Sequence, residues 1–321
     1  MSSSQERTIE GLYRLKSQSA QWHAMRAVAE VGILGELAKG QRTSQQLAET
    51  LGLNADAVSR LMKIVCRTEL VEQYGDDFAL TTVAQLMPAS LFDFGSNHLQ
   101  HLAKHLKTGK PIGDDAGWDT EMASREWTLT PAALTALQAL DIGGSRKGLS
   151  VLDVHCGSAV FATAFSHRDA GIRATLIDEA AQLERAKKTV DSVEIQSRVQ
   201  FVEIESGKNW WEAELPDPFE MVLAINEFHK LDSAKRKEWM SHSLGALKDE
   251  GELVIVDVFR GQEDGLERSE DYELELCLRT GGAICDATVI EAELKESGFR
   301  QVQFAWLTCE PFIYGLLLAT K

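Results

Sequence analysis

The sequence predicts an α/β protein in which a doubly wound, mainly parallel sheet follows a mainly helical N-terminal domain. From about residue 149 onward, short apolar strands alternate with helices, a pattern typical of a parallel sheet covered on both faces. Before that point apolar residues recur at steps of three and four, which is the spacing of a helix face. The length of 321 residues favours two domains over one or four.

Three helices are predicted near the start of the chain. The buried face of the first is formed by Trp22, Met25, Val28, Ala29 and Ile33. Thr43 or Ser44 can cap the second helix, and Gly52 ends it. Asn54 caps the third helix, whose apolar side carries Val58, Leu61, Met62 and Val65.

A predicted hairpin completes this first domain. Residues 70–73 and 78–81 read as short strands around a tight turn, and three helices followed by such a wing predict a winged helix. The third helix also places Arg60, Lys63 and Arg67 on one basic stripe, which suits either a DNA groove or a solvated face. We favour the solvated face, because winged helices also serve as dimerisation platforms and an acidic molecule repels phosphates.

Residues from about 86 to 140 are predicted to be largely helical and to connect the two domains. His98, His101 and His105 share one helical stripe there, since steps of three and four return to the same face. Three imidazoles can bind a transition metal, but no carboxylate or cysteine at ligand spacing accompanies them in the sequence. We therefore expect these histidines to line a substrate pocket, and we expect no metal site.

The second domain is predicted to contain five strands of a parallel sheet, followed by a closing antiparallel pair. The five strands are residues 150–154, 174–177, 199–204, 219–225 and 252–258. The helices between and after them are residues 161–167, 180–190, 233–247 and 290–297. The closing pair is formed by residues 304–307 and 313–319.

Composition excludes several classes of protein. The formal net charge is −16, divided into +1 for residues 1–110 and −17 for the remainder, which argues against nucleic acid or an anionic membrane as the main partner. No apolar run approaches the roughly 18–20 residues that span a bilayer, and residues 1–7 lack the apolar core of a secretory signal. Five scattered cysteines without a CxxC pair are typical of reduced thiols, so we expect a cytoplasmic protein.

Candidate functional residues follow the predicted strands, because ligands of doubly wound sheets bind beyond the carboxyl ends of the strands. An acidic residue after the second strand suits a ribose, since one carboxylate can accept from two hydroxyls. The candidates at the strand ends are Asp153, His155, Gly157, Asp178, Glu205, Asn226, His229 and Asp257.

These residues and the motifs around them resemble those of the class I S-adenosylmethionine-dependent O-methyltransferases that act on small molecules and carry an N-terminal winged-helix dimerisation domain. The segments similar to this family are residues 43–52, 54–70, 78–81, 151–161, 226–229, 247–253 and 281–282. The resemblance implies a Rossmann-like methyltransferase sheet, S-adenosyl-L-methionine as cofactor, a small-molecule acceptor and a homodimer formed through the N-terminal domain. It also implies three regions, which are a winged helix at 1–95, a helical connector at 96–140 that lines the substrate pocket, and the cofactor domain at 141–321.

The resemblance also implies roles for individual residues. Asp153 would orient the cofactor loop, and Gly157 would let the backbone approach the methionine end of the cofactor. Asp178 would bind the ribose, and Glu205 would meet the adenine amine. His155 and Asn226 are expected to border the same cofactor. His229 would be the general base, and Asp257 would orient it.

The chain departs from the family pattern at several of these positions. His155 and Ala159 stand where the family loop has its first and third glycines, so an imidazole faces the methionine end of the expected cofactor site. Lys230-Leu231 replaces the family's Asp-Trp, and residues 283–286 replace its Lys-Glu-Arg-Thr. The second carboxylate near the base therefore has no clear equivalent, with Asp286 a loose candidate.

The expected reaction is methyl transfer to a hydroxyl of a small, aromatic or polyketide-like acceptor. An in-line displacement mainly needs alignment of the reactants and a base, and histidine suits a phenol whose pKa is near 10. Two alternatives stay open. One is a degenerate family member that binds the cofactor without methyl transfer or catalyses another reaction, and the other is a ligand-sensing, DNA-binding regulator of the winged-helix type.

Overall fold

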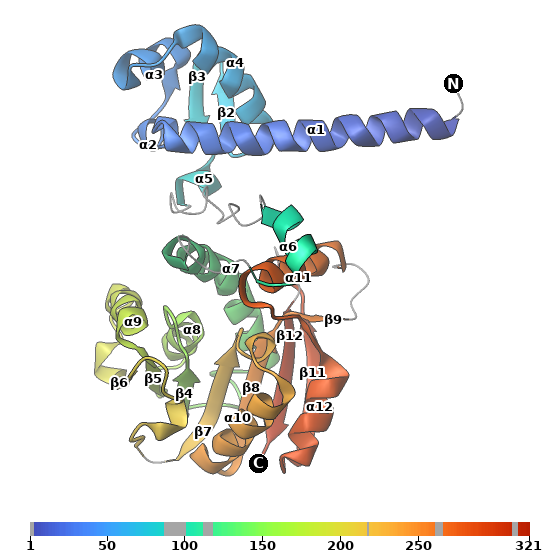
Figure 1. The fold of residues 1–321 in the computed structure, drawn as a ribbon. Helices are drawn as coiled ribbons and strands as arrows, with labels where there is room; N and C mark the ends of the chain where they lie inside the picture. Colours follow the sequence, from blue (N-terminus) through green and yellow to red (C-terminus); the bar gives the residue numbers. More distant parts are fainter. Residues whose placement is uncertain (1–2, 87–100, 112–117, 217, 261–265, 310–313) are drawn as a thin grey trace. The chain divides into compact units, whose positions relative to one another are not determined.

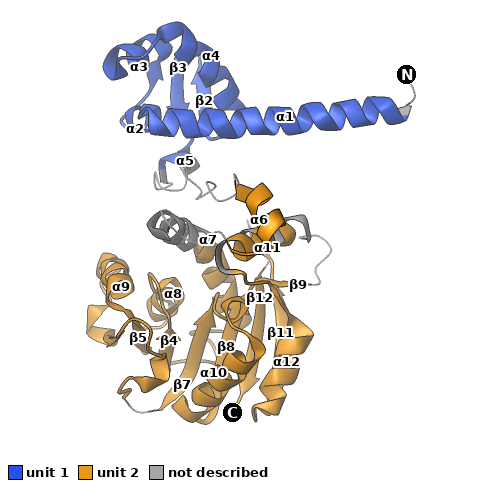
Figure 2. Ribbon diagram, in the orientation of Figure 1, with its two compact units in different colours: residues 1–96, 117–124 blue, residues 97–116, 125–321 orange. Residues whose placement is uncertain are grey.

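The computed structural model describes the chain except residues 1–2, 87–100, 112–117, 217, 261–265 and 310–313 (Figure 1). The described residues separate into two compact units (Figure 2). The first unit holds residues 1–96 and 117–124, and the second holds residues 97–116 and 125–321. The three regions expected from the sequence, 1–95, 96–140 and 141–321, stay a prediction.

Helices followed by a hairpin make up the first unit, in the order that the sequence predicts. Its helical elements are α1 (Ser3–Glu30), α2 (Ile33–Leu37), α3 (Ser44–Leu51), α4 (Ala55–Val65), the 3-10 turn η1 (Cys66–Thr68) and α5 (Thr82–Leu86). Its strands are β1 (Arg42–Thr43), β2 (Val71–Tyr74) and β3 (Asp77–Leu80). They form an antiparallel sheet in the order β1-β3-β2.

The predicted caps of two helices in this unit are confirmed. Thr43 Oγ1 accepts a hydrogen bond from Gln46 N at 3.1 Å, and Gln46 Oε1 accepts one from Thr43 N at 2.9 Å. Asn54 Oδ1 accepts from Ala57 N at 2.9 Å at the start of α4. Each cap satisfies N–H groups that the helix itself leaves unpaired, a contribution of about 1 kcal/mol.

The first predicted helix is broken in two. α1 ends at Glu30, Gly32 takes the left-handed conformation at φ 86°, and Ile33 begins the separate helix α2. A residue with a β-carbon is strained in that conformation, whereas glycine is not. Gly32 therefore lets the helix break at this point. Trp22 and Ile33 therefore belong to different helices.

The basic stripe also differs from the prediction. Arg60 and Lys63 lie exposed on α4, but α4 ends at Val65 and Arg67 lies in η1. Arg67 Nη2 donates to Ser17 Oγ at 2.7 Å, which ties that cation to α1. The three residues therefore do not form one continuous helical stripe.

The second unit contains the predicted sheet, with seven strands in the order β11-β12-β8-β7-β4-β5-β6. Its strands are β4 (Ser150–Val154), β5 (Arg173–Glu179), β6 (Val199–Ile204), β7 (Phe219–Ile225), β8 (Leu247–Asp257), β11 (Gln301–Leu307) and β12 (Tyr314–Thr320). β4 to β8 pair in parallel, whereas β12 runs antiparallel between β8 and β11. The doubly wound α/β fold with an antiparallel closing pair is confirmed.

Helices line both faces of this sheet. The helices after α5 in the chain are α6 (Leu102–Thr108), α7 (Trp118–Ala139), α8 (Val160–Arg168), α9 (Ala180–Ser192), α10 (Ser233–Ala246), α11 (Leu266–Thr280) and α12 (Ala287–Glu296). Short 3-10 turns are η4 (Gln196–Arg198), η5 (Trp210–Glu212) and η6 (Phe228–Lys230), and the two-residue strands β9 (Phe259–Arg260) and β10 (Cys285–Asp286) pair in parallel. α11, β9 and β10 were not expected from the sequence.

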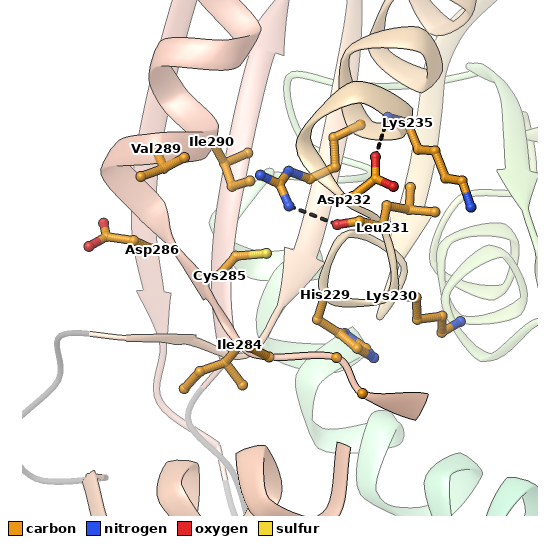
Figure 3. Close-up of a pocket in the computed structure, with 14 residues that line it drawn as sticks. His229, Lys230, Leu231, Asp232, Lys235, Ile284, Cys285, Asp286, Val289 and Ile290 are labelled. Carbon is orange, nitrogen blue, oxygen red and sulfur yellow. Dashed lines mark hydrogen bonds between the residues drawn. The ribbon is translucent and has the colours of Figure 1, made fainter. Parts of the chain in front are cut away.

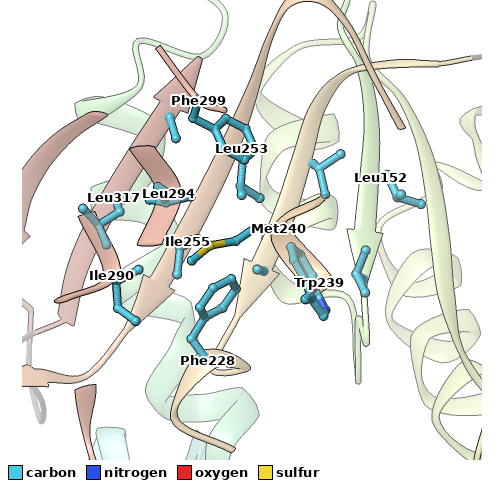
Figure 4. Packing of buried hydrophobic residues seen from close by; sticks show 14 of the residues in the cluster. Leu152, Phe228, Trp239, Met240, Leu253, Ile255, Ile290, Leu294, Phe299 and Leu317 are labelled. Carbon is cyan, nitrogen blue, oxygen red and sulfur yellow. The ribbon is translucent and has the colours of Figure 1, made fainter. Parts of the chain in front are cut away.

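Alternate strand residues supply two separate apolar cores. On one face Leu152 and Ile255 pack with Trp239 of α10 and Ile290 of α12 (Figure 4). On the other face their neighbours Val151 and Val254 pack with residues of α7, α8 and α11, namely Ala132, Phe161, Phe165 and Leu276. Because successive side chains of a strand point to opposite faces, this double burial explains why the strands are apolar throughout.

Candidate active site

The loop between β4 and α8 carries three residues in the left-handed backbone region. They are His155 at φ 51°, Gly157 at φ 55° and Ala159 at φ 59°. Only one of them is glycine, so the other two adopt a conformation that usually favours it at a cost of about 1–2 kcal/mol each. The loop backbone therefore keeps the left-handed conformation at these positions although two of the residues are not glycine. A hydrogen bond to the next strand holds one backbone N–H of the loop.

That strand contributes Asp178, which is 6% exposed. Its Oδ2 accepts from Gly157 N and its Oδ1 accepts from Glu179 N, both at 2.8 Å. Burial raises the pKa of Asp178, although both hydrogen bonds oppose this effect. Asp178 lies within β5 rather than after it, because β5 is longer than predicted. A carboxylate has about four acceptor positions, so two remain for ribose hydroxyls.

Asp153 lies inside β4 and is 2% exposed. Burial raises its pKa to about 8, while a backbone hydrogen bond from Ala162 lowers it and the charge of Asp178 raises it further. The bond to Ala162 joins the strand to the first turn of α8. This contact fits the expected role of Asp153 in orienting the loop.

His229 and Asp257 form a buried pair at the carboxyl ends of β7 and β8. His229 Nδ1 lies 2.7 Å from Asp257 Oδ1, and Asp257 Oδ2 accepts from His229 N at 3.1 Å. Their side chains have no exposed surface. A carboxylate can only accept, so it holds the Nδ1 proton and leaves the lone pair of the imidazole on Nε2.

Two buried polar atoms at this edge have no hydrogen-bond partner among the described residues. They are His229 Nε2 and the Oδ1 atom of Asn226, which is 5% exposed and has φ 53°. A buried polar atom without a partner costs free energy, and such atoms in a native protein call for a ligand or water. Their position, directly after β7, is where the sequence predicts the site.

One further charged residue at this edge of the sheet, Glu227, was not predicted from the sequence. Glu227 is 4% exposed and lies between two cations, with Oε1 2.8 Å from His155 Nδ1 and Oε2 accepting from Lys230 Nζ at 2.9 Å. Burial alone would raise its pKa, but Lys230 and His155 hold the pKa of Glu227 far below its usual range. Burial disfavours the imidazolium, but the Glu227 carboxylate outweighs it and raises the pKa of His155. The ring of His155 is thus tied to the segment that carries His229.

Glu205 is placed differently from the other candidates. It lies exposed after β6, and no described residue donates a hydrogen bond to its carboxylate. The structure therefore brings it into no network with Asp178 or Asp153. Its expected contact with an adenine stays a prediction.

A cavity of about 450 Å³ adjoins His229 (Figure 3). Its wall includes His229 and Lys230 from η6, Lys235 from α10, and the segment from Gly281 to Asp286 before α12. The ring of His229 also meets the ring of Tyr272 on α11 edge to face, at 5.8 Å between centroids. The predicted glycine pair thus lies beside His229. Asp286 caps α12 through Thr288 N at 2.9 Å, so its carboxylate is engaged at the helix start and not with His229.

The predicted histidine stripe of the connector is described only in part, because His98 lies outside the described residues. His105 is contacted by a cysteine, Cys277. Within the described part of the chain no cluster of three metal-ligating side chains occurs, and no helix is long and apolar enough to cross a membrane.

The fold is that of a class of solved structures, the two-domain fold seen in small-molecule O-methyltransferases. Mitomycin 7-O-methyltransferase MmcR is 18% identical, with a TM-score of 0.78 and 99% of each chain covered. The pyocyanin biosynthetic protein PhzM is 17% identical, with a TM-score of 0.79, 98% of this chain and 99% of that chain covered. Human N-acetylserotonin methyltransferase, solved with S-adenosylmethionine, is 18% identical, with a TM-score of 0.77 and 100% and 99% covered.

These likenesses are in fold. No protein-family model matches the sequence, and comparison with curated proteins finds no match.

Proposed function

We propose that the protein is an S-adenosylmethionine-dependent O-methyltransferase that acts on a hydroxyl of a small, aromatic or polyketide-like molecule. The observation that carries the proposal is the buried His229–Asp257 pair, in which Nε2 has no partner among the described residues. The likeness in fold to O-methyltransferases, one solved with S-adenosylmethionine and another with S-adenosylhomocysteine, supports the choice of cofactor.

The residues at the strand ends fit that cofactor. Asp178 keeps free acceptor positions for the ribose, and Gly157 has no β-carbon to hold the ligand away from the backbone. Asn226 Oδ1 is a buried acceptor that no described residue pairs with, which suits a donor on a bound molecule. When bound, S-adenosylmethionine supplies an electrophilic methyl group on sulfur.

His229 would act on the hydroxyl of the acceptor. A phenol with a pKa near 10 is protonated at neutral pH, so its oxygen must lose a proton as it attacks the methyl group. Nε2 would take this proton, and Asp257 would hold the ring and stabilise the imidazolium through Nδ1. The remaining contribution of the protein is alignment of the reacting atoms.

Substitution of the base tests this mechanism. His229→Gln keeps a polar side chain but removes the base, and we expect kcat to fall by about 10²–10⁴-fold. Asp257→Asn would lower kcat by about 10–100-fold, since the orientation and charge of the ring are lost. S-adenosylmethionine affinity, measured by calorimetry in both variants, should change less than about threefold, because neither residue is assigned to the cofactor.

The matched control is His242→Gln, which alters a histidine that stacks on Trp211 at 4.4 Å, away from the strand-end site. Its methyl-transfer rate should match wild type. A His229→Gln protein that transfers methyl at the wild-type rate would refute the assigned base and leave the class of enzyme open.

A second candidate is a cofactor-binding protein without methyl transfer, favoured by His155 and Ala159 at the left-handed loop positions. S-adenosylmethionine binding combined with no transfer across a broad panel of phenols and polyketides would support it.

We further propose that the first unit is a winged helix that forms a homodimer and that the protein is cytoplasmic. Light scattering of the purified chain tests the dimer.

A further inference from the structure

A cysteine and a histidine meet outside the strand-end site. Cys277 lies on α11 and His105 lies on α6, which run close together in the second unit (Figure 1). Cys277 Sγ is 3.6 Å from His105 Nε2, within the range of a sulfur hydrogen bond. The two residues are 172 positions apart in the sequence, so only the fold brings them together.

The second ring nitrogen of His105 decides which way this hydrogen bond runs. Nδ1 lies 2.9 Å from the carbonyl oxygen of Lys110. A carbonyl oxygen can only accept, so Nδ1 carries the proton of the neutral ring and Nε2 carries the lone pair. The Cys277 thiol therefore donates to Nε2. The thiol is thus the nucleophile, the imidazole is its base, and the carbonyl orients the imidazole, which is the arrangement that activates a cysteine.

The other thiols lie in different surroundings. Burial raises the pKa of Cys66, places that of Cys156 well above the ordinary value and raises that of Cys285 to about 12. Cys309 is half-buried and donates to the carbonyl oxygen of Leu307 at 3.5 Å, which cannot serve as a base at neutral pH. Cys277 is half-buried, so a small reagent can reach a thiol that already faces a base.

We propose that Cys277 and His105 form a nucleophilic pair that makes Cys277 a site of covalent modification by soft carbon electrophiles of the α,β-unsaturated carbonyl class. His105 Nε2 takes the thiol proton as the sulfur attacks the β-carbon, so an S–C bond forms and the C=C π bond breaks. The electron pair moves onto the carbonyl as an enolate, and the imidazolium returns the proton to the α-carbon. No oxidant or other co-reactant is needed.

Modification would reach the proposed base through α11. Tyr272, whose ring contacts His229, lies five residues before Cys277 on the same helix, about 7–8 Å along its axis. An adduct on Cys277 would then lower methyl transfer. This consequence alone rests on the proposed function, because the reactivity of the thiol does not.

The test uses N-ethylmaleimide, itself an activated alkene of this class, on the full-length protein at pH 7. Peptide mass mapping after increasing times measures the labelling rate of each cysteine. An ordinary thiol is only a few per cent ionised at this pH, so a thiol with a base should react about tenfold faster or more. We expect Cys277 to exceed Cys309 by that factor, with the buried Cys285 unlabelled.

Two variants separate base catalysis from mere exposure. His105→Gln offers an oxygen that can accept the S–H bond but cannot take the proton, and it should lower the Cys277 rate to that of Cys309. The control His101→Gln changes the exposed residue just before α6 and should leave the rate unchanged. Labelling of Cys285, which is buried, reports any unfolding of a variant.

Equal labelling of Cys277 and Cys309 in the wild-type protein would overturn the proposal, whatever the variants do. So would a Cys277 rate that survives His105→Gln in a protein whose Cys285 stays protected.

Discussion

At the scale of single residues, His155, which stands in place of a loop glycine, takes part in a partly buried ion pair. His155 adopts the left-handed conformation that glycine usually takes, and its ring is held 2.8 Å from the buried carboxylate of Glu227. Lys230, which stands where the resembling family has an aspartate, supplies the second cation for that carboxylate. Two departures from the family pattern thus belong to one network, which joins the β4–α8 loop to the segment that carries His229.

This network predicts a pH-dependent contribution to stability. Glu227→Gln should lower the free energy of unfolding by about 1–3 kcal/mol near pH 5–6, because it removes a buried charge shared by two cations. Folding depresses the pKa of Glu227 from its ordinary 4.5, so its contribution is present above that pH and is lost as the pH falls toward the folded value. Urea unfolding of both proteins at pH 3, 5.5 and 9 measures the difference.

Titration of His155, the partner of Glu227, sets the upper end of the pH range in which this ion pair contributes to stability. Folding raises its pKa above the ordinary 6.5, so the imidazolium contributes fully below that pH and its contribution is lost as the pH rises through the folded value. The difference between wild type and Glu227→Gln should therefore be smaller at pH 3 and at pH 9. The exposed carboxylate of Glu205 provides the control, with Glu205→Gln within about 0.5 kcal/mol of wild type. A difference that stays constant with pH would contradict this account.

At the scale of elements, the helices on the two faces of the sheet have separate apolar cores. Trp239 of α10 is 2% exposed and packs against Phe228 and Trp210 at 5.3 and 5.4 Å between ring centroids. Since Phe228 precedes His229 in η6, this face of the sheet also supports the segment that carries His229.

Trp239→Ala should lower the free energy of unfolding by about 3–5 kcal/mol, the cost of a large cavity in a packed core. Denaturant unfolding followed by circular dichroism measures the change. Val289→Ala on α12, where the side chain is 47% exposed, should change stability by less than about 0.5 kcal/mol. Equal losses in the two variants would show that the α10 face is not the packed core described here.

The elements that were predicted from sequence are those with strong local signals. The caps at Thr43 and Asn54 and the apolar strands on either side of the loop at Gly157 depend on residues close together in the chain. α11 was not predicted, because its sequence from Leu266 to Thr280 is rich in acidic residues and has a low mean hydropathy. One side of the helix is nevertheless buried against the sheet. β9 and β10 have two residues each and exist only through pairing with a distant segment, which no local pattern reveals.

The site was predicted to a similar extent. His229, Asp257, Asn226 and Asp178 lie together at the strand ends because parallel strands end at one edge of the sheet. The role of Glu227 depended on the direction of its side chain, and the Cys277–His105 contact depended on how α6 packs on α11. Neither can be read from spacing along the chain.

At the scale of the whole molecule, the acidic excess of residues 111–321 belongs largely to the unit that carries the strand-end site. Four of its buried carboxylates lie at or near the strand ends and have partners there, namely those of Asp153, Asp178, Glu227 and Asp257. In the first unit Arg60 and Lys63 are exposed and Arg67 is hydrogen-bonded to Ser17. The DNA-binding alternative therefore stays a prediction that rests on these basic residues alone.

Calorimetric titration of the full-length protein with S-adenosylmethionine tests the central claim most directly, since it needs no knowledge of the acceptor. The account predicts binding with a dissociation constant below about 1 mM, weakened about tenfold or more by Asp178→Asn through loss of a charged hydrogen bond to the ribose. Glu179→Gln, the exposed neighbour in the sequence, should bind as wild type does. No heat of binding at millimolar ligand in the wild-type protein would contradict the account.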